Sequence, residues 1–241
     1  MAAPAALRLS DSTPYDDYVR TEWALFSADP MRSVVGRELQ SSLEVDRVLD
    51  IGCGAGQEML PFLAERPALG VGIDVSLEAG QAGRELFREQ PLTGRIAFLR
   101  AGAESLPFTS AAFDVVICRL ALPYTDNRAA LAEIARVLRP GGALVLKFHH
   151  ARYYTSKLRD AIGTRRLKPA IHACRVLAAG TLYSLTGRQH RNRILGAETF
   201  QTRALLRREL AMHGLGIERE LPDSVPAAPS LLIRRADAHS R

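Results

Sequence analysis

The sequence predicts an α/β fold, in which a mainly parallel, doubly wound sheet is covered on both faces by helices and ends in an antiparallel hairpin. Short apolar runs of strand type alternate with amphipathic runs of helix type across residues 46–150, as in successive βαβ units. The first apolar run passes directly into a turn with three glycines. After the last helical run, two short strands joined by a loop predict a hairpin at one sheet edge.

The predicted elements follow one another in a regular order. Five apolar runs are expected to be strands, at 48–51, 70–74, 96–100, 113–118 and 143–148. Amphipathic periodicity predicts helices at 57–65, 77–88, 128–138 and 201–213. The hairpin strands are expected at 217–221 and 230–235. Residues 139–142 (RPGG) are expected to end the third of these helices and to turn into the fifth strand.

The chain of 241 residues is long enough for one sizeable domain with appendages. We expect an N-terminal helical lid at 1–45, a ligand-binding sheet domain at 46–150, a basic helical insert at 151–197 that forms a cap, and a C-terminal helix and hairpin at 198–241. The insert is longer than an ordinary connection between elements, which indicates helices and a purpose of its own.

Composition excludes several classes of protein. Hydrophobic residues make up 47% and charged residues 24% of the chain, so it should fold. The longest stretch without Asp, Glu, Lys or Arg has twelve residues, at 176–187, whereas a membrane span needs about 20. The first dozen residues lack the long apolar centre of a secretory signal. Three widely spaced cysteines form neither a disulfide framework nor a zinc motif, so we expect a cytoplasmic protein without a metal.

Charge is unevenly distributed along the chain. The net charge is +6, yet residues 1–150 hold 15 basic and 19 acidic residues, while 151–197 hold ten basic residues and one acidic residue. Such an excess either meets an anion or forms a solvated basic face.

An apolar stripe at helical spacing predicts an amphipathic helix in the same segment. The stripe consists of Leu167, Ile171, Cys174, Ala178, Leu182 and Leu185. Three interpretations remain open: the stripe packs on the rest of the protein, covers a substrate, or lies on a membrane surface that holds a lipid-like acceptor.

The glycine turn carries the first chemical signal. Gly52, Gly54 and Gly56 form GxGxG, which lets the backbone approach a ligand and directs amide groups toward it. Asp74 ends the next predicted strand, 22 residues after Gly52, where a carboxylate can accept hydrogen bonds from both hydroxyls of a ribose. The third glycine comes one residue earlier than in GxGxxG dinucleotide folds, which fits a ligand without a pyrophosphate.

Four segments match a known family in order and spacing: VLDIGCGAGQ (48–57), VGIDVS (71–76), AESLPFTSAAFDVVICRLAL (103–122) and ALAEIARVLRPGGALVL (130–146). On these segments the sequence resembles the class I S-adenosylmethionine-dependent methyltransferases, specifically the small-molecule type grouped around ubiquinone/menaquinone biosynthesis. The resemblance implies a Rossmann-like sheet of seven strands with the sixth and seventh antiparallel. It also implies S-adenosyl-L-methionine as the cofactor of the domain at 46–150.

The resemblance assigns eleven residues to the cofactor site. They are Asp50, Gly52, Cys53, Gly54, Gly56, Asp74, Val75, Ala103, Glu104, Cys118 and Arg119. Asp74 is expected to hold the ribose and Val75 to lie against the adenine. Members of the group often place Asp just before the Ala-Glu pair to bind the adenine amino group, but here that position is Gly102. Either Glu104 replaces this contact or the contact is lost, which costs only about 0.5–1.5 kcal/mol.

Three residues are candidates for catalysis on the acceptor side. His149 and His150 follow directly on the fifth predicted strand, and Tyr124 lies in the loop after the fourth. A neutral imidazole there can take a proton from a hydroxyl or an amine. Because successive residues of an extended chain face opposite sides, at most one histidine is expected to face the acceptor. The alternative is a structural role for both.

An aromatic segment precedes the sheet. Tyr15, Tyr18 and Trp23 lie in a helix-like stretch that resembles the lid helices of the family. It either closes over the reactive methyl group and excludes water, or packs its aromatic rings on the sheet.

We therefore expect methylation of a small molecule, acidic or lipid-like, with no nucleic acid as partner and a possible membrane-surface contact through the insert. RNA methylation is one alternative. Against it, residues 118–121 (CRLA) replace the Asn/Asp-Pro-Pro-aromatic tetrapeptide that base-amino methyltransferases usually carry there. Methylation of a cytosine carbon needs a cysteine nucleophile that follows a proline, and Cys118 follows Ile117. A non-catalytic scaffold is another alternative. The adenine contact missing at Gly102 suggests weak cofactor binding, whereas the intact glycine turn and Asp74 argue for a working cofactor site.

Overall fold

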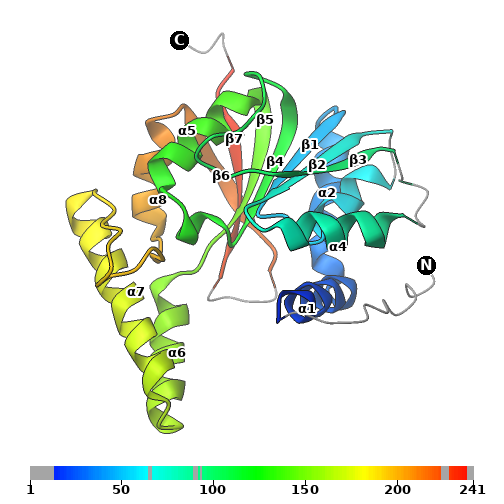
Figure 1. Cartoon of the computed structure of the whole chain (residues 1–241). Helices are drawn as coiled ribbons and strands as arrows, with labels where there is room; N and C mark the ends of the chain where they lie inside the picture. Colours follow the sequence, from blue (N-terminus) through cyan, green and yellow to red (C-terminus); the bar gives the residue numbers. More distant parts are fainter. Residues whose placement is uncertain (1–13, 65–66, 89–91, 93, 224–227, 238–241) are drawn as a thin grey trace.

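The computed structural model describes residues 14–64, 67–88, 92, 94–223 and 228–237. Its centre is one seven-stranded sheet of order β3-β2-β1-β4-β5-β7-β6 (Figure 1). The parallel strands are β1 (Arg47–Ile51), β2 (Leu69–Asp74), β3 (Ile96–Arg100), β4 (Phe113–Arg119) and β5 (Leu138–Lys147). The antiparallel strands are β6 (Leu215–Leu221) and β7 (Ser230–Arg235). The predicted fold class is confirmed.

Helices cover both faces of the sheet (Figure 1). One face carries α1 (Pro14–Ala28), α2 (Pro30–Ser42), α3 (Leu60–Leu63) and α4 (Leu77–Phe87), and the other carries α5 (Asn127–Val137) and α8 (Arg203–Ala211). The alternation of side chains along β1 divides the two cores: Val48 packs with α2 and α3, whereas Leu49 packs with α5 and α8.

Most element boundaries lie within two residues of the prediction, and two elements differ from it more substantially. The expected helix at 57–65 is a 3₁₀ turn, η1 (Gln57–Met59), followed by one turn of α-helix, α3. The fifth strand begins at Leu138, so residues 139–142 belong to it and do not precede it. Leu138 pairs with Phe113 and Ala143 pairs with Val115, so residues 139–142 form an irregular bulge in β5, where Gly141 has a φ of +72°.

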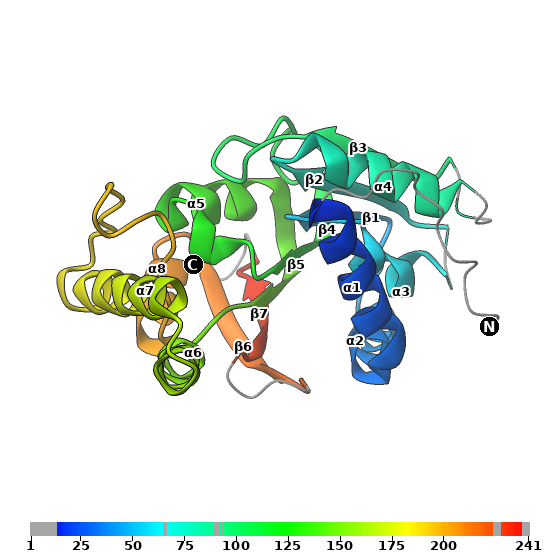
Figure 2. The same cartoon turned by 60° about the horizontal axis from the view of Figure 1, so that its bottom comes forward.

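The insert forms two helices, α6 (Ala151–Gly163) and α7 (Leu167–Thr186), which extend as a hairpin away from the sheet (Figures 1 and 2). The apolar stripe predicted as an amphipathic face does not pack on the protein: Leu167, Ile171 and Leu185 are 71%, 50% and 80% exposed. In the part of the chain that the structure describes, no helix is long and apolar enough to cross a membrane.

The opposite side of α7 is the buried one. Its buried residues are Ala173, Val176, Ala179, Gly180 and Tyr183. Small side chains let α7 approach its neighbours closely, because a Cβ at Gly180 would lie 2.3 Å from the ring of Phe200. The face of α7 that packs on the protein therefore includes small residues that allow close approach, whereas the larger aliphatic side chains of the stripe lie on the exposed face.

Candidate active site

The glycine turn after β1 opens the site. Gly52, Gly54 and Gly56 have φ of +68°, +53° and +80°, which L side chains rarely adopt. A Cβ at Gly52 would lie 2.5 Å from the Cβ of Ala121, and a Cβ at Gly56 would lie 2.8 Å from the ring of Phe98. Packing therefore requires both of these glycines. A Cβ at Gly54 would meet nothing within 4 Å, so the space beside this residue is open to a ligand.

Asp74, at the end of β2, reaches back to the glycine turn. Its Oδ2 accepts a hydrogen bond from the N–H of Gly54 at 3.2 Å, and its Oδ1 accepts one from the N–H of Ser76 at 2.9 Å. A carboxylate has about four acceptor positions, so Asp74 can fix the turn and still accept from a ligand.

Gly52, Gly54 and Asp74 line a cavity of about 390 Å³ at the carboxyl ends of β1, β2 and β4. Ligands of open α/β sheets bind at this edge, and the volume is typical of a small-molecule site. Eight of the residues predicted from the sequence line it: Gly52, Gly54, Asp74, Val75, Ala103, Glu104, Arg119 and Tyr124.

The other predicted cofactor residues lie at or behind the same turn. Asp50 and Cys53 line a smaller recess that shares the glycine turn with the main cavity. Gly56 and Cys118 line neither space. Gly56 shapes the turn, and Cys118 is a core residue of β4, where burial raises the pKa of its thiol to about 12. The Cys118 thiol therefore stays protonated at neutral pH.

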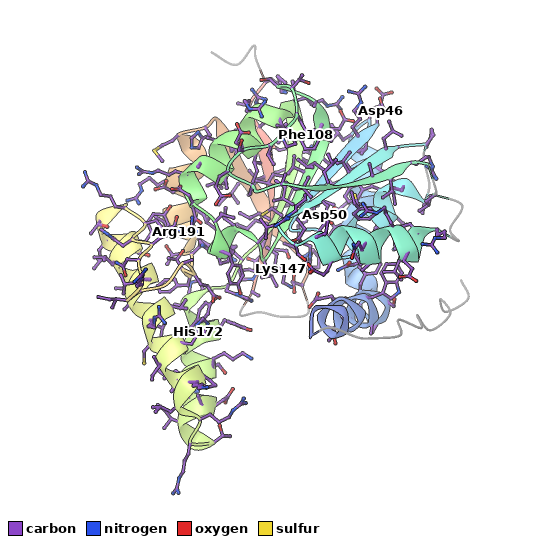
Figure 3. All side chains as sticks on the ribbon, in the orientation of Figure 1. Asp46, Asp50, Phe108, Lys147, His172 and Arg191 are labelled. Carbon is purple, nitrogen blue, oxygen red and sulfur yellow. The ribbon has the colours of Figure 1, made fainter. Side chains whose placement is uncertain are left out.

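Arg119 belongs to a buried network of charges at the ends of β4 and β5. Its guanidinium lies 3.2 Å from Glu58 and 3.9 Å from Asp223. Lys147, at the end of β5 and labelled in Figure 3, pairs with Asp223 at 2.6 Å. Two carboxylates thus neutralise two buried cations, and Arg119 borders the main cavity with its charge already partnered.

Glu104 occupies the space beside Gly102. Its Oε2 lies 3.2 Å from where a Cβ at Gly102 would stand. Its Oε1 accepts a hydrogen bond from the N–H of Asp126 at 2.9 Å and lies 3.6 Å from Arg191. A carboxylate is therefore present near the position at which the methyltransferases that the sequence resembles often carry aspartate.

The N-terminal helix packs beside the glycine turn. Trp23 meets Phe87 of α4 edge-on, with ring centroids 6.2 Å apart, and Glu22 borders the small recess. Trp23 thus packs on α4, beside the glycine turn. The side chains of Tyr15 and Tyr18 lie outside the described residues.

A second cavity, of about 250 Å³, lies between the end of β5 and the two helices of the insert. Its lining residues are Tyr124, His149, Tyr153, Tyr154, Lys157, Pro169, His172, Ala173 and Glu198. Tyr124 lines this cavity and the main one. The two spaces are therefore neighbours, and the insert supplies most of the walls of the second.

The two adjacent histidines have different surroundings. His149 lines the second cavity, with its ring stacked on Tyr153 at 3.9 Å between centroids and its Nδ1 3.1 Å from the hydroxyl of Tyr154. Burial lowers the pKa of His149 to about 4, so the ring is neutral at physiological pH. His150 does not line the cavity. Its Nδ1 caps α6 by accepting from the N–H of Arg152 at 3.4 Å.

Sequence reasoning missed the polar partners of His149. Tyr154 donates a short hydrogen bond to Oε1 of Glu198, and Oε2 of Glu198 lies 3.0 Å from Nε2 of His172. The only local signal was the Tyr153–Tyr154 pair, about one helical turn after His149. Among the described residues, no group of three or more His, Cys, Asp or Glu side chains is arranged to hold a metal ion.

Comparison with known proteins adds an independent result. Residues 49–146 match the family model described as "Methyltransferase domain". The chain is 32% identical over 133 residues to O-methyltransferase rstn1 of Aspergillus nomiae, covering 55% of this chain and 59% of that protein. It is 33% identical over 104 residues to ubiquinone/menaquinone biosynthesis C-methyltransferase UbiE of Shewanella piezotolerans, covering 42% and 41%.

Solved structures share the fold. The putative methyltransferase of Haloferax volcanii, solved with the Trm112 activator, superposes with a TM-score of 0.61 at 17% identity, covering 94% of this chain and 100% of that one. The chain spans only about half the length of the curated relatives it matches first. Residues 49–146 are therefore similar to a methyltransferase domain, and the chain shares the fold of solved methyltransferases.

Proposed function

We propose that the protein transfers the methyl group of S-adenosylmethionine to a small-molecule acceptor. One observation carries the proposal: the glycine turn and Asp74 line one cavity, His149 lines a second, and Tyr124 borders both. A cofactor site and an acceptor site with a base are thus adjacent. The names of the relatives, an O-methyltransferase and a C-methyltransferase, agree with a small acceptor and leave its reacting atom open.

The residues of the main cavity fit the proposed cofactor. Open space at Gly54 admits a ligand against the backbone, and the Asp74 carboxylate can accept from both ribose hydroxyls. Val75 and Ala103 offer apolar surface for the adenine, with Glu104 at its edge. S-adenosylmethionine supplies a methyl group on a positively charged sulfur, which is a good leaving group. The chain has to align the acceptor, exclude water and accept a proton.

The insert contributes to the acceptor site in this proposal. Residues of α6 and α7 line the second cavity beside His149 and Tyr124. The insert therefore acts as a cap with a part in selecting the acceptor, while the cofactor is held by the strand ends.

Methyl-labelled S-adenosylmethionine tests the proposal. The protein should bind the cofactor in calorimetry and transfer label to one product in a small-molecule or lipid extract. Label in tRNA or rRNA instead would favour RNA methylation, for which the basic insert is the supporting feature. Failure to bind the cofactor would leave the scaffold interpretation.

Truncating Glu104 to alanine should weaken cofactor binding by up to about tenfold, because one hydrogen bond is worth about 0.5–1.5 kcal/mol. Adding Gly102→Asp to that variant should restore affinity, since a Cβ at Gly102 meets only the Glu104 carboxylate that has been removed. The dissociation constant of S-adenosylmethionine measures both effects. An unchanged constant in Glu104→Ala would show that Glu104 does not contact the adenine.

We also propose that the insert contacts an anionic membrane surface. The stripe that does not pack on the protein exposes Leu167, Ile171 and Leu185, and the basic residues Arg165 and Lys168 beside it are exposed too. Apolar side chains flanked by cations are typical of helices that lie in a membrane interface.

Flotation with vesicles tests this contact. The protein should bind vesicles that contain phosphatidylserine better than neutral ones, and salt should weaken binding because charge attraction is screened over about 8–10 Å. Changing Arg165, Arg166 and Lys168 together to Gln should remove most of the preference. Arg203, Arg207 and Arg208 on α8 provide a matched triple Gln control outside the insert. If both triple variants lose vesicle binding equally, only the net charge of the protein matters. If the parent protein shows no preference for vesicles that contain phosphatidylserine, the proposed contact is refuted.

We further place the protein in the cytoplasm. Its three cysteines are free, and Cys174 is exposed on α7. An exposed lone thiol is kept reduced most readily in that compartment.

A further inference from the structure

We infer that the second cavity is an acceptor site for an aromatic hydroxyl, in which Tyr154 and Glu198 hold His149 in the tautomer that removes the hydroxyl proton. The inference rests on the proposed function and adds to it a class of acceptor and two positioning residues. These groups meet from three parts of the chain: His149 follows β5, Tyr154 lies in α6 and Glu198 precedes α8.

The direction of the hydrogen bonds determines the tautomer of His149. Tyr154 has a single hydroxyl proton, and it donates this proton to Glu198. At the contact of 3.1 Å with His149, the Tyr154 oxygen can then only accept, so Nδ1 of the histidine carries the proton. A neutral imidazole has one N–H, which leaves the Nε2 of His149 with a free lone pair. Nε2 is the atom that can take a proton from a ligand.

Packing holds the ring of His149 in one orientation. The ring of Tyr153 covers one of its faces at an interplanar angle of 3°, and that of Tyr154 meets it edge-on. The backbone carbonyl of His149 accepts a hydrogen bond from the N–H of Gln201 at 3.2 Å. Only 7% of the residue is exposed, so the imidazole is reached from the cavity and not from bulk solvent. A fixed ring with a free Nε2 is a preorganised base.

The walls of the cavity indicate which acceptor needs this base. Its walls are mainly aromatic, and its volume of about 250 Å³ exceeds the roughly 150 Å³ that holds benzene, so a substituted ring has room. Lys157 lies 5.4 Å from the Tyr153 ring, and both oxygens of Glu198 already have partners, which disfavours an ammonium group. A carboxylate acceptor would need no base. A hydroxyl on a flat ring fits the aromatic walls, carries no positive charge and needs a base to remove its proton.

The proposed step balances with the established chemistry of the cofactor. The hydroxyl oxygen gives its proton to Nε2 of His149 and forms a bond to the methyl carbon. The carbon–sulfur bond breaks and its electron pair stays on sulfur, which becomes neutral. The imidazolium is stabilised through Tyr154 by the charge of Glu198, and it returns its proton to water.

A pair of phenols with different acidity tests the inference. Phenol needs a base, whereas 4-nitrophenol is largely ionised at about pH 8, well below the pKa of about 10 of an ordinary phenol. The Tyr154→Phe variant keeps the ring and removes the hydroxyl. We expect its kcat on phenol to fall about tenfold or more, its kcat on 4-nitrophenol to fall less than threefold, and its affinity for S-adenosylmethionine to stay unchanged. Glu198→Gln should show the same selectivity.

Tyr183→Phe is the matched control. It removes a buried tyrosine hydroxyl from α7 outside both cavities, so both phenols should be turned over as by the parent. Equal losses of Tyr154→Phe on both phenols, or preferential methylation of benzylamine or benzoate by the parent, would overturn the inference. Methylation of neither phenol by a parent that binds the cofactor would also overturn it and leave the proposed function intact. A parent that does not bind the cofactor would refute the proposed function itself.

The tautomer can be measured without any acceptor. In ¹⁵N NMR spectra of the parent, His149 should show a protonated Nδ1 and an unprotonated Nε2 at neutral pH. In Tyr154→Phe the two tautomers should become mixed, because Nδ1 loses its acceptor. A parent spectrum with the proton on Nε2 would contradict the hydrogen-bond assignment.

Discussion

Replacing Gly54 by valine is expected to lower the affinity for S-adenosylmethionine by about 100-fold or more. The Cβ position of Gly54 faces open space in the main cavity, so a branched side chain there occupies the volume of the ligand. Asp74→Ala should have an effect of similar size, because two charge-assisted hydrogen bonds to ribose are worth roughly 1.5–3 kcal/mol each. Calorimetric titration of the folded variants with the cofactor measures both.

Backbone strain has to be separated from loss of space, because Gly54 has a φ of +53°. Valine in that conformation costs about 1–2 kcal/mol of stability wherever it stands. Gly214→Val is the matched control: Gly214 has φ +69° and open space at its Cβ, but lies far along the chain, between α8 and β6. Both variants should lose stability, and only Gly54→Val should lose the cofactor. Parent-like binding by folded Gly54→Val and Asp74→Ala would refute the site.

The cavity at the glycine turn could be predicted from the sequence because its signals are local. The glycine turn is three residues within five positions, and Asp74 ends the very next strand, so β–turn–α order alone brings them together. Even Gly102, the departure from the family pattern, and Glu104, which occupies the space beside it, are only two residues apart. Parallel strand order then carries each motif to the same edge of the sheet.

The second cavity depends on contacts that no local pattern encodes. Glu198 is 44 residues from its partner Tyr154, and nothing in its sequence neighbourhood marks it. The apolar stripe of α7 left three interpretations open for a related reason, and its exposure excludes only the one in which it packs on the protein. Hydrophobic periodicity favours burial of Leu167 and Leu185 over burial of Gly180. In the structure Phe200 packs closely against Gly180, which requires a small residue there, and the two leucines lie on the exposed side of the helix.

His149→Ala is expected to lower kcat by about 10²–10⁴-fold, the usual contribution of a general base, with the affinity for the cofactor unchanged. His150→Ala should keep kcat close to the parent value, because His150 caps α6 and does not line either cavity. Steady-state kinetics with the acceptor found in the labelling experiment compare the two. Equal losses would indicate a structural role at the end of β5, and no loss in His149→Ala would exclude a catalytic one.

The pH profile of the parent then separates a base from a mere contact. Burial lowers the pKa of His149 to about 4, so the ring stays neutral, and able to accept a proton, down to that pH. The value of kcat/KM should therefore be flat through pH 6.5, where an ordinary histidine titrates, and should fall only as the pH approaches about 4. The stability of the fold should change in the same direction. Because the pKa of His149 is lower in the folded than in the unfolded state, the free energy of unfolding should decrease as the pH falls from about 6.5 toward 4. In His149→Gln the residual activity should lack this acidic limb. If the limb persists in that variant, the group that titrates is another residue, and His149 is not the base.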